Sequence, residues 1–172
     1  MRDIYVVGDA NVDIIVPYPR FLNEERTLVD YPNPELVGGG TSANTAVALA
    51  KLGLPVSFLG TIGDDQYGKY IQKDFKEQGV NTADLIVDPK LNTVGVFAFI
   101  DENGERYLWG WPRVDQAFKV LERDKVPFEK IEAADWVHSS GMSLVYDTSA
   151  RTEIIEIFKK AYEAGVPVSY TH

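Results

Sequence analysis

The sequence has 172 residues, of which 45% are hydrophobic and 25% are charged, and its formal net charge is −9 at pH 7. This charge argues against a general surface for nucleic acids or anionic membranes, and the absence of cysteine excludes disulfides, thiolate catalysis and cysteine-bound zinc. Because His138 and His172 are the only histidines, a multi-histidine metal site is not expected, and no metal ligands are predicted.

The N-terminal stretch carries no export signal. "MRDIYVVGDA" turns polar at Gly8 and Asp9, too early for the apolar region of a signal peptide. No run approaches the ~18 apolar residues that a membrane helix needs. A cytoplasmic protein without a nucleic-acid or membrane partner is therefore expected.

Apolar periodicity along the chain predicts strands that alternate with helices. Short β-branched runs bounded by glycine or proline indicate strands, and apolar residues at helical spacing indicate helices. The expected elements, in chain order, are a strand over 3–9, an edge strand or strand end over 11–19, an exposed polar excursion over 20–36, a helix over 42–52, a strand over 55–63, a helix over 66–79, two strands within 93–111, a helical or mixed stretch over 113–132, a strand over 134–141, a helix over 149–165 and a strand over 166–170. The edge position follows from the two prolines that close the second run. The alternation indicates an α/β sheet with parallel strands and right-handed crossovers.

The stretch "TVGVFAFIDENGERYLWGW" (93–111) departs from this alternation. Two strand-like runs flank "DENG", in which Asn103-Gly104 suits a hairpin turn that needs positive φ. Together with the polar excursion, the hairpin predicts a small β layer that projects from the main sheet.

The stretch "VGGGTSANTAVALAKLG" (37–53) places three glycines directly against an amphipathic helix. One interpretation is that a polar ligand approaches the bare main chain and the N–H groups at the start of the helix, which lack partners within it. The other is that the glycines only make a tight connection. "GGGTSAN" lacks the lysine of a phosphate-binding P-loop, and "VVGDANVD" has one glycine where a dinucleotide fingerprint needs more.

Four motifs in this order carry a family resemblance: "GDANVD" (8–13), "GGGTSAN" (38–44), "TIGDDQYG" (61–68) and "HSSG" (138–141). Together they resemble the ribokinase-like, or PfkB, family of carbohydrate kinases, and the resemblance extends over the whole chain.

The resemblance implies a ribokinase-like three-layer α/β sandwich with a mostly parallel sheet, here incomplete, plus a small β-sheet lid. It also implies that residues 1–172 are the N-terminal part of such a kinase domain. The lid would be formed by two segments inserted into the α/β core, 14–37 and 93–112.

The same resemblance assigns candidate substrate-binding residues. Asp13 would accept hydrogen bonds from sugar hydroxyls, with Asn11 beside it, and such bonds to a carboxylate are stronger than those between neutral groups. Gly39 and Gly40 would place main-chain N–H groups on the substrate, and the amide of Asn44 would donate and accept. The alternative for Asp13 is an aspartate that caps local main chain at a strand end.

In the family that this sequence resembles, the lid excludes water from the active site, because water would otherwise hydrolyse ATP. Five aromatic residues of the hairpin are candidates for packing over the ligand or for a lid–lid contact in a homodimer: Phe97, Phe99, Tyr107, Trp109 and Trp111. The alternative is that they stabilise the hairpin by ordinary cross-strand contacts.

Other polar residues have more ordinary interpretations. Arg106 and Arg113 either meet a carboxylate or phosphate on an acidic sugar or are solvated. His138 is expected to be a hydrogen-bonded core histidine, and Asp64 and Asp65 are expected to cap the helix that follows them.

The family's second signature, Asp-Thr-x-Gly-Ala-Gly-Asp, is not found within the 172 residues; "YDTSAR" (146–151) lacks its glycines and second aspartate. The resemblance therefore implies that the catalytic aspartate and the ATP site lie beyond His172. ATP and magnesium would be cofactors of the full-length protein, and this chain alone is expected to be inactive. The implied function is ATP-dependent phosphorylation of a sugar or polyol hydroxyl; the alternative is a non-catalytic sugar-binding or dimerising module without the ATP site.

Overall fold

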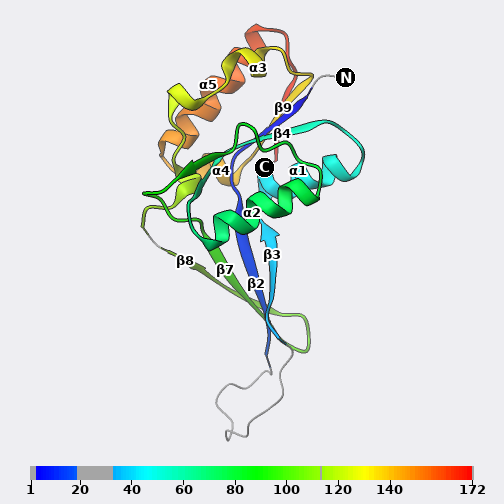
Figure 1. Ribbon diagram of the computed structural model, residues 1–172, viewed down its shortest axis with the longest axis vertical. Helices are drawn as coiled ribbons and strands as arrows, with labels where there is room; N and C mark the ends of the chain where they lie inside the picture. Colours follow the sequence, from blue (N-terminus) through cyan, green and yellow to red (C-terminus); the bar gives the residue numbers. More distant parts are fainter. Residues whose placement is uncertain (1–2, 19–32, 113, 172) are drawn as a thin grey trace, which may run out of the picture.

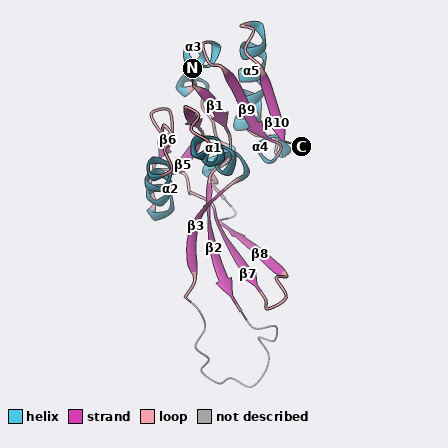
Figure 2. Cartoon of the chain, turned by 90° about the vertical axis from the view of Figure 1, so that its right-hand side faces the viewer, coloured by secondary structure: helices cyan, strands magenta, loops and turns pink. Residues whose placement is uncertain are grey.

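The computed structural model describes residues 3–18, 33–112 and 114–171. The described strands form a four-stranded sheet in the order β10-β9-β1-β4 (sheet A), a four-stranded sheet in the order β3-β2-β7-β8 (sheet B), and a two-stranded sheet of β5 and β6. Sheet A lies among the helices, and sheet B extends away from them (Figures 1 and 2). No helix within the described ranges is long and apolar enough to cross a membrane.

The elements have the following bounds. The helices are α1 (Thr41–Lys51), α2 (Gln66–Glu77), α3 (Phe128–Glu132), α4 (Met142–Val145) and α5 (Ser149–Glu163), with short 3-10 turns at Ala117–Lys119 and Arg123–Lys125. The strands are β1 (Ile4–Val7), β2 (Asn11–Pro17), β3 (Glu35–Gly39), β4 (Val56–Leu59), β5 (Thr61–Gly63), β6 (Ile86–Asp88), β7 (Gly95–Ile100), β8 (Arg106–Trp111), β9 (Trp136–Ser140) and β10 (Val168–Thr171).

Sheet A is parallel throughout, and helices cover both of its faces. Successive residues of a strand point to opposite faces. On β1, Tyr5 and Val7 therefore join the cluster that contains Ile154 of α5. Val6 joins the opposite cluster, which contains Phe75 of α2. This arrangement confirms the predicted three-layer α/β fold with a mostly parallel sheet.

Sheet B is the β layer that the sequence places outside the main sheet. β2 pairs with β3 in antiparallel fashion and with β7 in parallel, and β7 and β8 form a hairpin. Gly104 in its turn has a φ of 79°. Residues 19–32, which belong to the predicted segment 14–37, lie outside the described residues.

Of the two alternatives for 11–19, the edge strand is wrong, because β2 has a partner strand on each side, whereas the strand end agrees with β2, which ends at Pro17. Its pairing with β3 ends where Ile15 lies opposite Glu35. Pro17 therefore sits beyond that ladder, where its missing N–H removes no hydrogen bond to β3.

The single strand predicted over 55–63 is two strands. A side chain at Gly60 would collide with the carbonyl oxygen of Gly8, so the chain passes close to the end of β1 and leaves sheet A there. β5 then pairs with β6, which the sequence analysis did not predict, and α4 was also missed.

Candidate functional site

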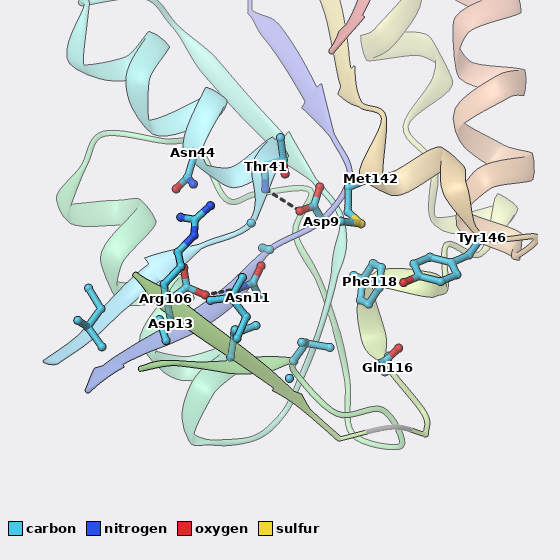
Figure 3. Close-up of a pocket in the computed structure, with 18 of the residues that line it drawn as sticks. Asp9, Asn11, Asp13, Thr41, Asn44, Arg106, Gln116, Phe118, Met142 and Tyr146 are labelled. Atoms are coloured by element: carbon cyan, nitrogen blue, oxygen red, sulfur yellow. Dashed lines mark hydrogen bonds between the residues drawn. The ribbon is translucent and has the colours of Figure 1, made fainter. Parts of the chain in front are cut away.

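A cavity of about 710 Å³ lies between the N-terminal end of α1, the loop after β1 and one face of sheet B (Figure 3). Its polar lining residues are Asp9, Asn11, Asp13, Thr41, Asn44, Arg106 and Gln116. Its apolar lining residues include Ile15, Val96, Ala98, Ile100, Leu108, Phe118, Met142 and Tyr146. A pocket with an apolar lining and a few convergent polar groups is typical of a small-molecule site.

Asp13 lies on the cavity face of β2. Its Oδ1 accepts a hydrogen bond of 2.8 Å from Nδ2 of Asn11 (Figure 3). Burial raises the pKa of the Asp13 carboxyl, and the hydrogen bond from Asn11 opposes that rise. Within the described part of the chain, no hydrogen bond to Oδ2 is found. Asp13 therefore lines the cavity with one carboxyl oxygen held by Asn11, while Oδ2 lies close to Gly39 without a hydrogen-bond donor from this part of the chain.

The start of α1 is occupied by a side chain of the protein itself. The main-chain N–H of Thr41 donates to Oδ2 of Asp9 over 2.6 Å, and that of Ser42 donates to Oδ1 over 3.2 Å. The N–H groups of Ala43 and Asn44 donate to main-chain carbonyls. The expectation that a ligand reaches free N–H groups at the start of this helix is therefore wrong, because Asp9 takes their place.

Asp9 was not singled out from the sequence, yet it joins elements that are distant along the chain. Only 5% of it is exposed. Besides the two main-chain groups of α1, its Oδ1 accepts hydrogen bonds from the hydroxyls of Ser42 (2.8 Å), Ser140 (2.7 Å) and Ser143 (3.1 Å). The available signal was an acidic residue at the end of the predicted strand 3–9, a position from which a carboxylate can reach a helix N-terminus.

The three glycines are explained largely by contacts within the chain. A Cβ at Gly38 would lie 2.6 Å from Oδ2 of Asp74, and one at Gly39 would lie 2.6 Å from Oδ2 of Asp13. Gly40 has a φ of 102°, and a Cβ there would approach the Asp9 carbonyl oxygen to 2.8 Å. Gly40 lines the main cavity, whereas Gly39 lines a neighbouring one of about 350 Å³. Gly39 therefore makes room for the Asp13 carboxylate, whereas the nearest atom at Gly38 is the tip of the Asp74 side chain, which can move aside.

The hairpin aromatics point away from the cavity. In the register of sheet B, Val96, Ala98 and Leu108 line the cavity, and the residues between them lie on the opposite face. The aromatic residues on that opposite face are Phe97, Phe99, Tyr107, Trp109 and Trp111. The prediction that they pack over a ligand in this cavity is therefore wrong.

These rings instead make cross-strand contacts, which was the alternative interpretation. The Phe97 ring stacks on Trp109, with centroids 5.6 Å apart, and on Trp111, with centroids 4.5 Å apart. Tyr107 and Trp109 nevertheless remain 75% and 55% exposed, so part of this face is open to solvent.

The two acidic residues predicted to cap α2 behave differently. Oδ1 of Asp65 accepts the N–H of Gly68 over 2.8 Å and is the N-cap. Asp64 instead forms an exposed ion pair of 3.2 Å with Lys69.

The remaining predicted polar residues fall at three different places. Arg106 lines the cavity, and Arg113 lies outside the described residues. Nδ1 of His138 is 2.9 Å from the hydroxyl of Ser169, and burial lowers the pKa of the imidazole. His138 is therefore hydrogen-bonded through Nδ1 as expected, but it is only partly buried, and its Nε2 has no hydrogen-bond partner among the described residues.

The raised pKa of Asp13 gives a stability prediction. Because the folded-state pKa lies above the ordinary value of 3.8, ionisation of Asp13 destabilises the fold at neutral pH. The D13N variant keeps an acceptor for Asn11 and removes the charge, so its free energy of unfolding at pH 7 should equal or exceed that of the unsubstituted protein. The difference should shrink as the pH falls through the raised pKa toward 3.8. Denaturant unfolding between pH 4 and pH 7.5 measures this, and a D13N protein less stable by more than ~1 kcal/mol at pH 7 would contradict it.

Comparison with known proteins connects this geometry to a family. A model of the pfkB family carbohydrate kinases matches residues 1–171. The chain is 34% identical over 172 residues to a fructokinase of Vibrio alginolyticus, covering 99% of this chain and 50% of that protein. It is 38% identical over 170 residues to a 5-dehydro-2-deoxygluconokinase of Listeria monocytogenes, covering 98% of this chain and 50% of that protein.

Solved structures agree with these matches. The crystal structure of a fructokinase from Xylella fastidiosa superposes with a TM-score of 0.83 at 25% identity, covering 99% of this chain and 52% of that one. A fructokinase from Vibrio cholerae superposes with a TM-score of 0.78 at 26% identity, covering 99% and 53%. The chain thus spans about half the length of these relatives.

Proposed function

The chain belongs to the pfkB family of carbohydrate kinases, and on that premise we propose that it supplies the sugar-binding half of an ATP-dependent kinase. The whole protein would transfer a phosphoryl group to a hydroxyl of a sugar or related polyol. The relatives named as fructokinase and 5-dehydro-2-deoxygluconokinase make a ketose or a sugar acid the first candidates for the acceptor.

The observation that carries this proposal is the Asp13 carboxylate, which faces the cavity with only Oδ1 engaged by Asn11. Its other oxygen would accept sugar hydroxyls, and a partly buried carboxylate makes stronger bonds to hydroxyls than a neutral acceptor does. Asn44, on the first turn of α1, would donate to or accept from a further hydroxyl. Asn11 would hold the carboxylate in place. Gly39 and Gly40 would place main-chain N–H groups on the sugar.

Sheet B would act as the lid, and its strands overlap the predicted lid segments 14–37 and 93–112 in the residues that the structure describes. Its cavity face is mainly aliphatic, with Ile15, Ala98, Ile100 and Leu108 beside the polar groups. Covering a bound sugar with this face would exclude water, which otherwise competes with the sugar hydroxyl for the phosphoryl group. The half-exposed aromatic face on the other side is a candidate contact for a second copy of the chain.

Carbohydrate kinases of this family use ATP and a divalent metal. The part of the chain that the structure describes contains no group of three or more histidine, cysteine, aspartate or glutamate side chains able to hold a metal ion. The start of α1 is filled by Asp9 and so offers no free site for a phosphate. The described residues therefore offer neither a three-ligand metal site nor a phosphate site at the start of α1. We propose that the rest of the whole protein binds the nucleotide and its metal and supplies the catalytic aspartate.

A kinase assay on two forms of the protein tests the proposal. The whole protein, incubated with ATP, magnesium and a sugar panel, should phosphorylate at least one sugar, whereas residues 1–172 alone should show negligible turnover. Calorimetric titration of both forms with the same sugars should detect sugar binding by each form in which the cavity between α1 and sheet B is folded. Sugar binding without phosphoryl transfer by the whole protein would favour the alternative of a non-catalytic sugar-binding module. Turnover by residues 1–172 at ordinary kinase rates would refute the proposal that the rest of the whole protein supplies the ATP site and the catalytic aspartate.

A further inference from the structure

We propose that Asp65 is a positioning residue for sugar binding, because its carboxylate holds the start of β7 against the start of α2. This inference rests on the proposed function, since it concerns the affinity of the same cavity for its sugar. Asp65 does not belong to the described lining of that cavity. Its effect on the sugar would therefore be exerted through the strands of sheet B.

The two oxygens of the Asp65 carboxylate hold two different parts of the chain. Oδ1 accepts the N–H of Gly68 over 2.8 Å and caps α2, whereas Oδ2 accepts the N–H of Thr93 over 2.8 Å. A helix cap needs only the first of these bonds. The second bond joins residues that are 28 positions apart, and it reaches the segment directly before β7, which begins at Gly95.

Thr93 is also held from a second direction. Its side-chain oxygen accepts the N–H of Gly63 over 2.9 Å, and only 2% of the residue is exposed. The chain packs closely here, because a Cβ at Gly63 would lie 2.7 Å from Oδ2 of Asp65, and one at Gly68 would collide with the carbonyl oxygen of Gly63. The segment before β7 is therefore fixed between β5 and the first turn of α2.

A main-chain hydrogen bond connects this segment to the strand that carries Asp13. Val94 follows Thr93 and lines the cavity, and its carbonyl oxygen accepts the N–H of Val12 over 3.0 Å. Val12 is buried and lies between Asn11 and Asp13 on β2. A displacement of Thr93 would therefore move β7 and, with it, change the position of Asp13 relative to α1.

The other strand of the hairpin is held by the same turn of α2. Trp111 lies opposite Gly95 at the base of the hairpin, and its ring meets the ring of Tyr67 edge-on, with centroids 5.6 Å apart. Asp65 and Tyr67 thus contact the two strands of one hairpin. The bond from Thr93 is expected to be the stronger of these two contacts, because its acceptor is a charged group.

The variant D65N separates the two bonds of Asp65. Asparagine caps a helix as well as aspartate does, so the bond from Gly68 can remain, but an NH₂ group replaces the oxygen that accepts from Thr93. D64N is the matched control. Asp64 directly precedes Asp65 and forms an exposed ion pair of 3.2 Å with Lys69, so D64N removes the same charge beside the same helix.

Both variants would be measured in the whole protein with D-fructose, D-ribose and 2-keto-3-deoxy-D-gluconate. For the sugar that binds most tightly, D65N should raise the Kd without ATP and the KM by about 5- to 30-fold, and it should change the KM of ATP by less than about 2-fold. D64N should change each of these constants by less than about 2-fold. A sugar-specific rise would not follow from a general loss of stability.

Hydrogen exchange measures the proposed contact without a sugar. Amide exchange over residues 93–100 should become faster in D65N than in D64N, and exchange in β1 and β9 should be the same in both. If D65N does not accumulate as a folded protein, D65S takes its place, because serine keeps a capping oxygen and has no second one.

The outcomes separate the two proposals. If D65N and D64N bind the sugar equally well, or if exchange over 93–100 is the same in both, the inference about Asp65 is overturned, and phosphorylation by the unsubstituted protein would leave the kinase proposal in place. If D65N weakens sugar binding but no sugar is phosphorylated, the inference holds and the kinase proposal fails. An unsubstituted whole protein that binds none of these sugars would overturn both.

Discussion

Replacement of Asp13 by asparagine is expected to remove most of the sugar-dependent activity of the whole protein while ATP binding stays nearly unchanged. Hydrogen bonds to a charged group contribute roughly 1.5–3 kcal/mol each, so the loss of two of them lowers kcat/KM on the order of 10²-fold or more. Asparagine at this position can still accept from Asn11 through its oxygen, so the local geometry of β2 should survive. Steady-state kinetics with varied sugar, and separately with varied ATP, measure both effects.

A matched control for D13N lies on the same sheet. Glu102 is an exposed carboxylate in the β7–β8 turn and is not part of the cavity lining. E102Q removes the same charge and should leave kcat/KM within about 2-fold of the unsubstituted protein, as is usual for surface substitutions. If D13N and E102Q behaved alike, Asp13 would not be a substrate-binding residue.

Substitution of Asp9 by alanine should cause a large loss of stability. It would leave the N–H groups of Thr41 and Ser42 and three buried serine hydroxyls without their acceptor. An unsatisfied buried polar group costs about 1–3 kcal/mol, so the total loss should reach on the order of 3–5 kcal/mol. Denaturant unfolding of the whole protein measures this difference.

Two further variants keep the Asp9 prediction testable if the alanine variant does not accumulate as a folded protein. D9N retains one acceptor oxygen and should lose less stability than D9A. S143A removes a single donor and should cost about 1 kcal/mol. Equal stability of D9A and S143A would show that the hydrogen bonds of Asp9 do not hold α1 against β1 and β9.

The sequence predicted those parts of the fold that depend on local patterns. β-branched runs identified the strands of sheet A, and helical periodicity identified the helices α1, α2 and α5. The sequence "DENG" identified the β7–β8 hairpin. The interior position of β2 was missed because its partner β7 lies far along the chain, so no local pattern reveals the pairing. The family resemblance stated from four motifs is confirmed by the match over residues 1–171.

The candidate site was predicted less completely, for reasons of geometry. Alternation along β7 and β8 separates Phe97 and Trp109 from Ala98 and Leu108, but the sequence does not reveal which set faces the cavity. The role of Asp9 depends on Ser140 and Ser143, which are 131 and 134 residues away. The three glycines drew attention to the edge of the cavity, although the group that approaches the start of the helix is a carboxylate of the chain itself.

In the proposed function, the Asp13 carboxylate holds the hydroxyls of a small sugar inside the cavity between α1 and sheet B. A crystal structure of the whole protein with the sugar it binds most tightly tests this directly. We expect two sugar oxygens about 2.5–3.0 Å from the Asp13 carboxylate oxygens, with Asn44 within hydrogen-bonding distance of the same molecule. A sugar bound elsewhere, with both Asp13 oxygens hydrogen-bonded to protein groups, would contradict it.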